Sequence, residues 1–260
     1  MRCGFVLPHT AGPFNDSADD IVALEKLGFT SIWFRDWPLG LGGDFADGYD
    51  PLVYAGQVGS LLQNAETELG FAAIQLGYRS PQVTAKSLVS IAALTGRRLR
   101  VGVGPRGPID LAQTWRQLYG YLRGTYEPEL FARPDGWITP DLLLCSNKPE
   151  VWEAVDGHVD GWLCGGLAAK GIDDKARELL DGAEGDTVVV QLSLRVDAGN
   201  PDTVERDAQG HLRAGQRKLA ELMRRYSVRG VDEIILRPPD HHFTARELAI
   251  AVDTVRSAGS

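Results

Sequence analysis

Charged side chains directly follow several β-rich runs of this sequence, where they could form a binding site. The stretch "SIWFRDWPLG" (31–40) begins as an apolar run and then places Arg35 and Asp36 between two tryptophans. A solvated turn more often carries Gly, Asn or Ser than a charged pair flanked by Trp. Two interpretations remain open: the pair lines a binding site, or it forms a salt bridge that holds the loop at the rim.

The segment "GVGPRG" (102–107) suits a phosphate group. Its glycines let a backbone approach a ligand, and Arg106 offers a charged donor. The spacing also matches a dinucleotide-binding fingerprint, which would be expected in the first strand-helix unit of the chain. The motif lies in the fourth unit, and Pro105 removes one of the amides that would hold a pyrophosphate. We therefore favour a phosphate contact over a dinucleotide fold.

A second phosphate candidate is "LLCSNKPEV" (143–151). Ser146, Asn147 and Lys148 precede Pro149, which is a good first residue for a helix. A helix start at this point would present amides, a hydroxyl and an ammonium group to an anion. The alternative is an ordinary helix cap without a ligand.

The five histidines do not form a metal-binding pattern. His9 follows the first β-rich run and is the best-placed candidate for an acid or base. His241 and His242 are adjacent, so they cannot face one metal ion from a regular element. His158 and His211 have no partner pattern. We expect no metal site.

Eight β-rich runs, each followed by a helical pattern, must position these residues. The runs are 3–8, 30–36, 68–76, 98–104, 141–146, 160–166, 187–196 and 231–239. Alternating strands and helices indicate a parallel sheet. Eight such units in 260 residues favour a closed (β/α)8 barrel, the TIM barrel, as a single α/β domain over residues 1–260. A long polar helix through Arg225 is expected after the seventh run.

Active sites of such barrels lie at the C-terminal ends of the strands. The side chains that this topology would bring there are His9, Arg35, Asp36, Arg106, Ser146, Arg195 and Arg237.

Composition limits the classes of partner. The formal net charge of −8 argues against nucleic acid, because phosphate backbones need clustered Lys and Arg. The three cysteines have no metal-ligand spacing and fit reduced thiols in the cytoplasm. The sequence shows neither a signal peptide nor an apolar run of membrane-spanning length, so we expect a cytoplasmic protein without a membrane partner.

Three stretches together resemble the bacterial luciferase-like monooxygenase family. They are "LEKLGFTSIWFRD" (24–36), the segment from "YDPLVYAG" to "GVGPRG" (49–107) and "VDGHVDGWL" (155–163). The likeness is greatest to the luciferase-type oxidoreductase branch, whose second strand also ends in Phe-Arg-Asp-x-Pro-Leu. The resemblance implies a TIM barrel that binds FMN or a deazaflavin at the C-terminal strand ends, usually as a homodimer packed through its early helices.

The resemblance also implies roles for single residues. The segment "AAIQLGYRSP" is similar to the third strand of the family, where a non-prolyl cis peptide lies beneath the isoalloxazine ring, and Ala72-Ala73 falls at that place. Arg106 matches a basic residue that contacts the flavin phosphate in some members, and Ser146 matches a phosphate-binding serine. Asn147 and Lys148 would complete that phosphate site.

The sequence departs from the family at several positions. The family commonly carries a His where Asp36 or its neighbour stands, and Ser80 replaces the usual His before Pro81. The segment after the fourth strand, which commonly helps to cover the flavin in the family, is short, and so is the region after the seventh strand. This chain therefore resembles a trimmed member.

From these features we expect an FMN-dependent oxidoreductase, a monooxygenase that uses O2 and reduced flavin from a separate reductase on a small organic substrate. Arg35 and Asp36 would face the substrate, with His9 as acid or base. The alternatives are a deazaflavin-dependent hydride-transfer enzyme, a non-catalytic flavin-binding barrel, and a flavin-free lyase or isomerase that binds a phosphorylated metabolite. We expect a homodimer through the helices at 51–64 and 81–95, whose small residues are Ala55, Gly59, Ala85 and Ala92.

Overall fold

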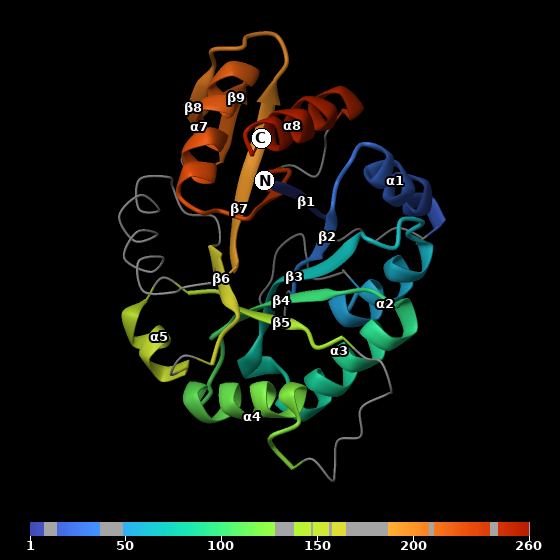
Figure 1. Ribbon diagram of the computed structural model, residues 1–260, viewed down its shortest axis with the longest axis vertical. Coiled ribbons are helices and arrows are strands. Elements are labelled where there is room, and N and C mark those ends of the chain that lie inside the picture. Colours follow the sequence, from blue (N-terminus) through green and yellow to red (C-terminus); the bar gives the residue numbers. More distant parts are fainter. Residues whose placement is uncertain are drawn as a thin grey trace.

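A ring of helices surrounds the strands, and the helices follow one another around the ring in chain order (Figure 1). This computed structural model describes residues 1–7, 15–36, 49–127, 138–146, 148–155, 158–164, 187–207, 211–239 and 244–259.

The strands and helices alternate along most of the chain. The strands are β1 (Arg2–Val6), β2 (Ser31–Phe34), β3 (Glu68–Gln75), β4 (Leu99–Gly104), β5 (Asp141–Leu144), β6 (Gly161–Cys164), β7 (Thr187–Asp197), β8 (Val204–Arg206), β9 (Leu212–Gly215) and β10 (Glu233–Arg237). The helices are α1 (Asn15–Lys26), α2 (Pro51–Leu61), η1 (Leu76–Tyr78, 3-10), α3 (Pro81–Thr95), α4 (Leu111–Arg123), α5 (Pro149–Val155), α7 (Gln216–Val228) and α8 (Ala245–Ser257).

Eight of the strands form a closed parallel barrel. β1 to β7 pair in chain order, β10 pairs with β1, and a further parallel pairing between β10 and β7 closes the ring. All eight predicted runs supply one barrel strand each, and β3 lies between β2 and β4 as expected. The prediction of a single-domain TIM-barrel architecture is confirmed. An open sheet with a dinucleotide site at "GVGPRG" does not fit, because β4 is an interior member of the closed ring.

One segment differs from the prediction. The polar helix expected after the seventh run begins only at Gln216, and a two-stranded hairpin of β8 and β9 precedes it. The connection "DAGNPD" (197–202) explains the difference, since Asp197 Oδ1 accepts hydrogen bonds of 3.0 Å from the amides of Gly199 and Asn200. Such a turn reverses the chain. β9 then pairs with the end of β7 that extends beyond the barrel.

A buried polar network fills the lower end of the barrel, where the strands begin. The Glu233 carboxylate is fully buried and accepts hydrogen bonds from Ser31 Oγ and, at 2.8 Å, from Arg100 Nη1. Arg100 Nε also lies 2.9 Å from the Glu68 carboxylate. Trp33 Nε1 donates to Ser31 Oγ at 2.7 Å. Because each charge has an opposite partner, the barrel can hold them without water.

The indole of Trp33 fills the centre of the barrel and is fully buried. The indole fits there because the facing residue on β3 is glycine. A Cβ at Gly70 would overlap the indole ring. A Cβ at Gly4 would likewise overlap Ser31 Oγ. Strand glycines here are required by close packing and not by an unusual backbone conformation.

The small residues of α2 and α3 are not on the surface. Ala55, Gly59, Ala85 and Ala92 are all buried within the chain. A Cβ at Gly59 would meet Thr95 Cγ2 at 2.5 Å, so this glycine lets α2 approach the end of α3. The argument that these residues offer a dimer face is therefore wrong, although it leaves the expectation of a dimer itself untested.

A pair of glycine substitutions tests the packing around Trp33. Gly70→Ala should lower the free energy of unfolding by about 2 kcal/mol, because the methyl group displaces a ring that has no room to move. Gly56→Ala, in α2 with nothing within 4 Å of the new Cβ, should raise it by about 0.5–1 kcal/mol through helix propensity. Urea unfolding would measure both. A Gly70→Ala protein as stable as the wild type would contradict the packing.

Candidate functional site

The candidate site is the barrel mouth, which we define as the C-terminal ends of the eight barrel strands. Below it lies an apolar cluster that fills the barrel interior. Its members are Val6, Trp33, Ala72, Ala73, Leu143, Leu163, Val189 and Ile235. Since side chains alternate along a strand, Arg35, Cys145, Gln191 and Arg237, two positions beyond Trp33, Leu143, Val189 and Ile235, point into the mouth.

The floor of the mouth on the β3 side consists of small residues. The Ala72-Ala73 peptide bond is cis, as the family resemblance implied. The register of β3 against β4 shifts between Phe71 and Ile74, so the strand bulges at this place. Two methyl groups leave a low apolar surface there, which can carry a flat ring.

Asp36 ties the end of β2 to the segment after β3. Its side chain is 2% exposed and accepts from both Nε and Nη2 of Arg79, at 2.9 and 2.8 Å. It also accepts from the Gln75 amide at 3.0 Å. Arg79 extends further to Asp50 at 2.8 Å, and Asp36 raises the pKa of Arg79 above its usual value. Asp36 thus forms a rim salt bridge with Arg79, while its predicted catalytic role stays a prediction.

Three arginines converge on the mouth from different strands. Arg35 follows β2, Arg106 follows β4 and Arg237 ends β10. Burial lowers the pKa of Arg35 to about 10, and the positive charges of Arg237 and Arg106 contribute to the shift. Burial also lowers the pKa of Arg237. The site is therefore cationic and partly dry, and a bound anion would stabilise it.

The two phosphate candidates lie at neighbouring strand ends. The carbonyl of Arg106 accepts from the Gly77 amide at 2.9 Å, which fixes this loop against the turn after β3. Ser146 Oγ accepts from the Lys148 amide at 3.2 Å, in the turn directly before α5. Cys145 is next to Ser146 in the chain, and burial raises the pKa of its thiol to about 11. The positive charge of Arg106 acts in the opposite direction but is the smaller effect. Arg106 and Ser146 are thus placed as predicted, and their role as phosphate ligands stays a prediction.

Gln75 adds a polar group beside the floor. Its Nε2 donates to the Ala73 carbonyl at 3.2 Å, whereas its buried Oε1 has no partner among the described residues. A Cβ at Gly104 would lie 2.6 Å from Oε1, so the glycine makes room for the amide. An acceptor held in this way can receive an N–H group of a ligand.

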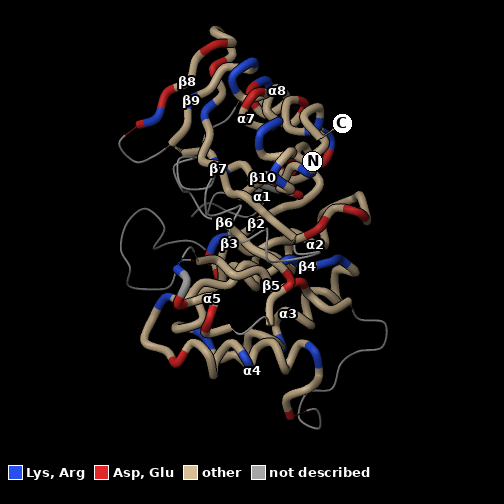
Figure 2. The backbone as a smooth tube through the Cα atoms, turned by 60° about the vertical axis from the view of Figure 1, so that its left-hand side comes forward, with Lys and Arg blue, Asp and Glu red and all other residues tan. Residues whose placement is uncertain are grey.

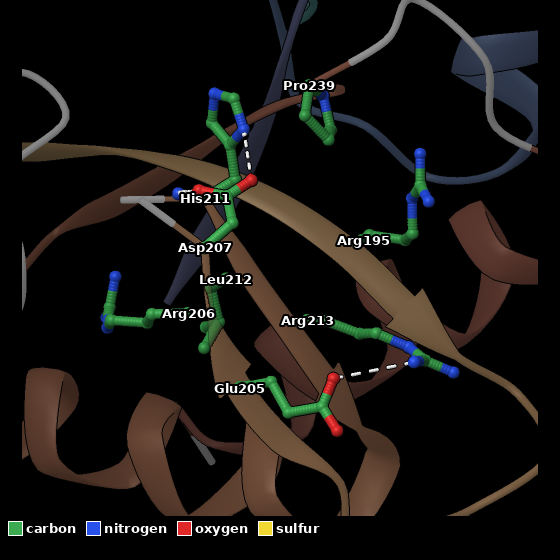
Figure 3. A pocket seen from close by; sticks show the side chains of 8 residues that line it. All are labelled: Arg195, Glu205, Arg206, Asp207, His211, Leu212, Arg213 and Pro239. Carbon is green, nitrogen blue, oxygen red and sulfur yellow. Dashed lines mark hydrogen bonds and ion pairs between the residues drawn. The ribbon is translucent and has the colours of Figure 1, made fainter. Parts of the chain in front are cut away.

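A pocket of about 390 Å³ lies beside the mouth, beneath the β8–β9 hairpin. Its lining residues are Arg195, Glu205, Arg206, Asp207, His211, Leu212, Arg213 and Pro239 (Figure 3). Charges of both signs gather on this hairpin (Figure 2). Since Arg195 belongs to β7 and Pro239 follows β10, the pocket adjoins the mouth.

His211 in this pocket has a partner that the sequence did not indicate. Its Nδ1 lies 2.8 Å from Asp207 Oδ2, and its amide donates to Oδ1 at 2.8 Å. One of the two dashed lines in Figure 3 joins His211 to Asp207. The two residues are four positions apart across the hairpin, a spacing that would have pointed to the pair had the hairpin been recognised.

Two predicted site residues, His9 and Asn147, lie outside the described residues, as do His241 and His242. In the described part of the chain, no three His, Cys, Asp or Glu side chains are grouped so that they could hold a metal ion. None of the described helices has the length and apolar character needed to cross a membrane.

Solved structures with the same fold include oxidoreductases whose names mention coenzyme F420 or FMN. The coenzyme F420 dependent tetrahydromethanopterin reductase from Methanopyrus kandleri is 14% identical, with a TM-score of 0.69 over 100% of this chain and 99% of the other. An F420-dependent secondary alcohol dehydrogenase in complex with an F420-acetone adduct is 12% identical, with a TM-score of 0.75 over 100% and 99%.

A flavin enzyme shows the same likeness. The oxygenating constituent of 3,6-diketocamphane monooxygenase from Pseudomonas putida, in complex with FMN, is 11% identical, with a TM-score of 0.66 over 98% of both chains. No protein-family model matches the chain, and a search of curated protein sequences gives no match. At these identities the likeness is one of fold.

Replacing Asp36 tests the salt bridge at the rim. Asp36→Asn removes the charge that faces Arg79 in a buried setting, so the free energy of unfolding should fall by about 3 kcal/mol. Asp50→Ser is the matched control: it keeps a helix cap and loses only an exposed ion pair, so it should cost no more than about 1 kcal/mol. Urea unfolding of the two variants would compare them. Equal losses would show that Asp36 does not hold the rim.

Proposed function

We propose that this chain is a luciferase-like oxidoreductase that binds FMN in the barrel mouth and acts on a small organic substrate as a monooxygenase. The observation that carries the proposal is the convergence of Arg35, Arg106 and Arg237 above a floor of small residues. Like charges crowded into a partly buried site favour an anionic ligand, and the floor suits a flat one. A flavin phosphate joined to a flat ring has both properties.

The residues of the mouth fit such a cofactor. Ala72 and Ala73 would lie beneath the ring, and Gln75 Oε1 could accept from a ring N–H. Arg106 would hold the phosphate, and Ser146, Asn147 and Lys148 would contribute at the start of α5. Bound reduced flavin would supply the electrons and activate O2.

The side chains of the chain itself would position the substrate and exclude water. Arg35 would face the substrate, held in place through its neighbour Asp36 and the Asp36–Arg79 pair. The pocket beneath the hairpin would take part of the substrate. A separate reductase would deliver reduced flavin, and the three free cysteines fit a cytoplasmic setting.

A deazaflavin coenzyme is the second candidate, supported by the two similar structures that depend on coenzyme F420. Both cofactors are flat and anionic, so the same mouth would accept either. The enzyme would then transfer hydride and would not need O2. The absorption spectrum of purified protein mixed with each cofactor and passed through a desalting column would show which one is retained. A non-catalytic flavin-binding barrel would retain FMN but turn over no substrate.

Substitution of Arg106 tests the phosphate contact. Arg106→Ala removes a cation from a partly desolvated phosphate, so FMN binding should weaken by about 1.5–3 kcal/mol, or on the order of 10- to 150-fold. Riboflavin lacks the phosphate, so it should bind the wild type poorly and respond little to the change. Isothermal titration of both ligands would measure this, with Arg116→Ala on the exposed face of α4 as the control. Equal losses for both ligands, or no FMN binding to the wild type, would end the assignment.

The assembly proposal is a homodimer through α2 and α3. Exposed apolar side chains on these helices are Val53, Val83 and Leu94, with exposed fractions of 74%, 64% and 85%. Light scattering at micromolar concentration should give a dimer mass for the wild type and a monomer mass for Val53→Glu combined with Val83→Glu. The control is Val228→Glu at the end of α7, which is also exposed and should stay dimeric. A wild-type monomer would contradict the proposal.

A further inference from the structure

Three polar side chains point into the barrel mouth from two neighbouring strands. Val189 on β7 and Ile235 on β10 belong to the interior cluster. Because side chains alternate, Gln191, Ser193 and Arg237 lie on the same inner face. The strand register pairs Arg237 with Ser193 and Ile235 with Gln191, so the three side chains are immediate neighbours.

Two members of this group, Ser193 and Arg237, have hydrogen-bonding groups without a partner in the described part of the chain. Gln191 is only 8% exposed, so its amide is held at the inner wall of the mouth. Ser193 Oγ is buried without a partner in the same part of the chain. Arg237 is half-buried there without an ion pair, and burial lowers its pKa. A half-buried cation beside an unsatisfied hydroxyl is unfavourable unless a ligand completes the group.

The donors of this group define the ligand. A guanidinium, a hydroxyl and an amide NH2 can all donate, and Arg35 adds a second positive charge nearby. A ligand that only accepts hydrogen bonds and carries negative charge satisfies all of them. A carboxylate or sulfonate has these properties, and its paired oxygens match the two parallel donors of Arg.

We propose that Arg237, Ser193 and Gln191 form a subsite for the acid group of an organic-acid substrate. This inference rests on the proposed function, since it assigns the substrate class of the same mouth. The remainder of the substrate would extend along β7 past Arg195 into the pocket beneath the hairpin, which this strand and the segment after β10 help to line (Figure 3).

The position of the subsite favours a substrate over the cofactor phosphate. Its residues belong to barrel strands, so a bound acid lies towards the centre of the mouth, where reacting groups bind in this architecture. Arg106, the candidate for the cofactor phosphate, lies in the loop after β4. In the closed ring three strands separate β10 from β4 in either direction, so the two anion positions are on opposite sides.

Titration with a charged probe and its neutral counterpart tests the subsite. Benzoate and benzamide have nearly the same shape and differ in charge. Without flavin, the wild type should bind benzoate about tenfold or more tightly than benzamide, and Arg237→Gln should abolish that preference. Arg237→Lys keeps the charge and should retain part of it. Arg116→Gln, on an exposed helix face, should behave as the wild type.

Thermal unfolding and FMN binding separate a ligand site from a structural role. Without ligand, Arg237→Gln should unfold about 2 °C or more above the wild type, because it removes a half-buried cation that has no counter-ion among the described residues. A structural arginine would give a lower unfolding temperature when replaced. Arg237→Gln should weaken FMN binding much less than it weakens benzoate binding, because Arg106 holds the phosphate on the opposite side of the mouth.

Each contrary result has a distinct meaning. Equal binding of benzoate and benzamide by the wild type, no binding of either, or a lower unfolding temperature for Arg237→Gln would overturn the subsite. A loss of FMN affinity equal to the loss of benzoate would assign Arg237 to the cofactor phosphate and also overturn it. Failure of every variant to bind FMN would contradict the proposed function, while the benzoate result would still stand.

Discussion

The Glu233 carboxylate, fully buried at the lower end of the barrel, is the constraint on which the rest of the structure depends. It brings Ser31 from β2 and Arg100 from β4 to one point, so side chains from strands that are not neighbours are tied together across the barrel. With that end closed by polar groups, the indole of Trp33 occupies the centre. The upper end of the barrel, its mouth, is therefore the end that can take a ligand. The floor of the mouth is formed by the interior cluster that contains Trp33 and the small side chains of Ala72 and Ala73.

The two ends of the barrel use charge in opposite ways. At the lower end the carboxylates of Glu68 and Glu233 both face Arg100, and opposite charges paired in this way stabilise the barrel. At the mouth, Arg35, Arg106 and Arg237 face one another instead. Repulsion between like charges lowers stability, and functional sites often keep such arrangements for a ligand. The Asp36–Arg79 pair is an ion pair like those at the lower end, but it lies at the rim of the mouth. It holds the rim in place and does not pair with the three arginines of the mouth.

The sequence predicts the eight strands because each is an apolar run of β-rich residues followed by a helix pattern. The sequence also predicts that Arg35, Arg106 and Arg237 lie at the same end of the barrel, because the C-terminal ends of its parallel strands are all on one side. It does not predict the Asp36–Arg79 bridge, whose partners are 43 residues apart, or the Asp207–His211 pair, which needs the hairpin. The subsite on β7 and β10 depends on register, which pairs Ser193 with Arg237 and which no local pattern reveals. The histidine at position 9 and the asparagine at position 147 lie outside the described residues, so their predicted roles stay predictions.

A crystal structure of the protein soaked with FMN tests the central claim most directly, because the claim is about place. We expect the ring against Ala72 and Ala73 at the C-terminal strand ends, with the phosphate on the side of Arg106 and Ser146. The β7 and β10 side, with Arg237, should remain open for a substrate. Flavin bound outside the barrel mouth, or with its phosphate on Arg237, would contradict this account.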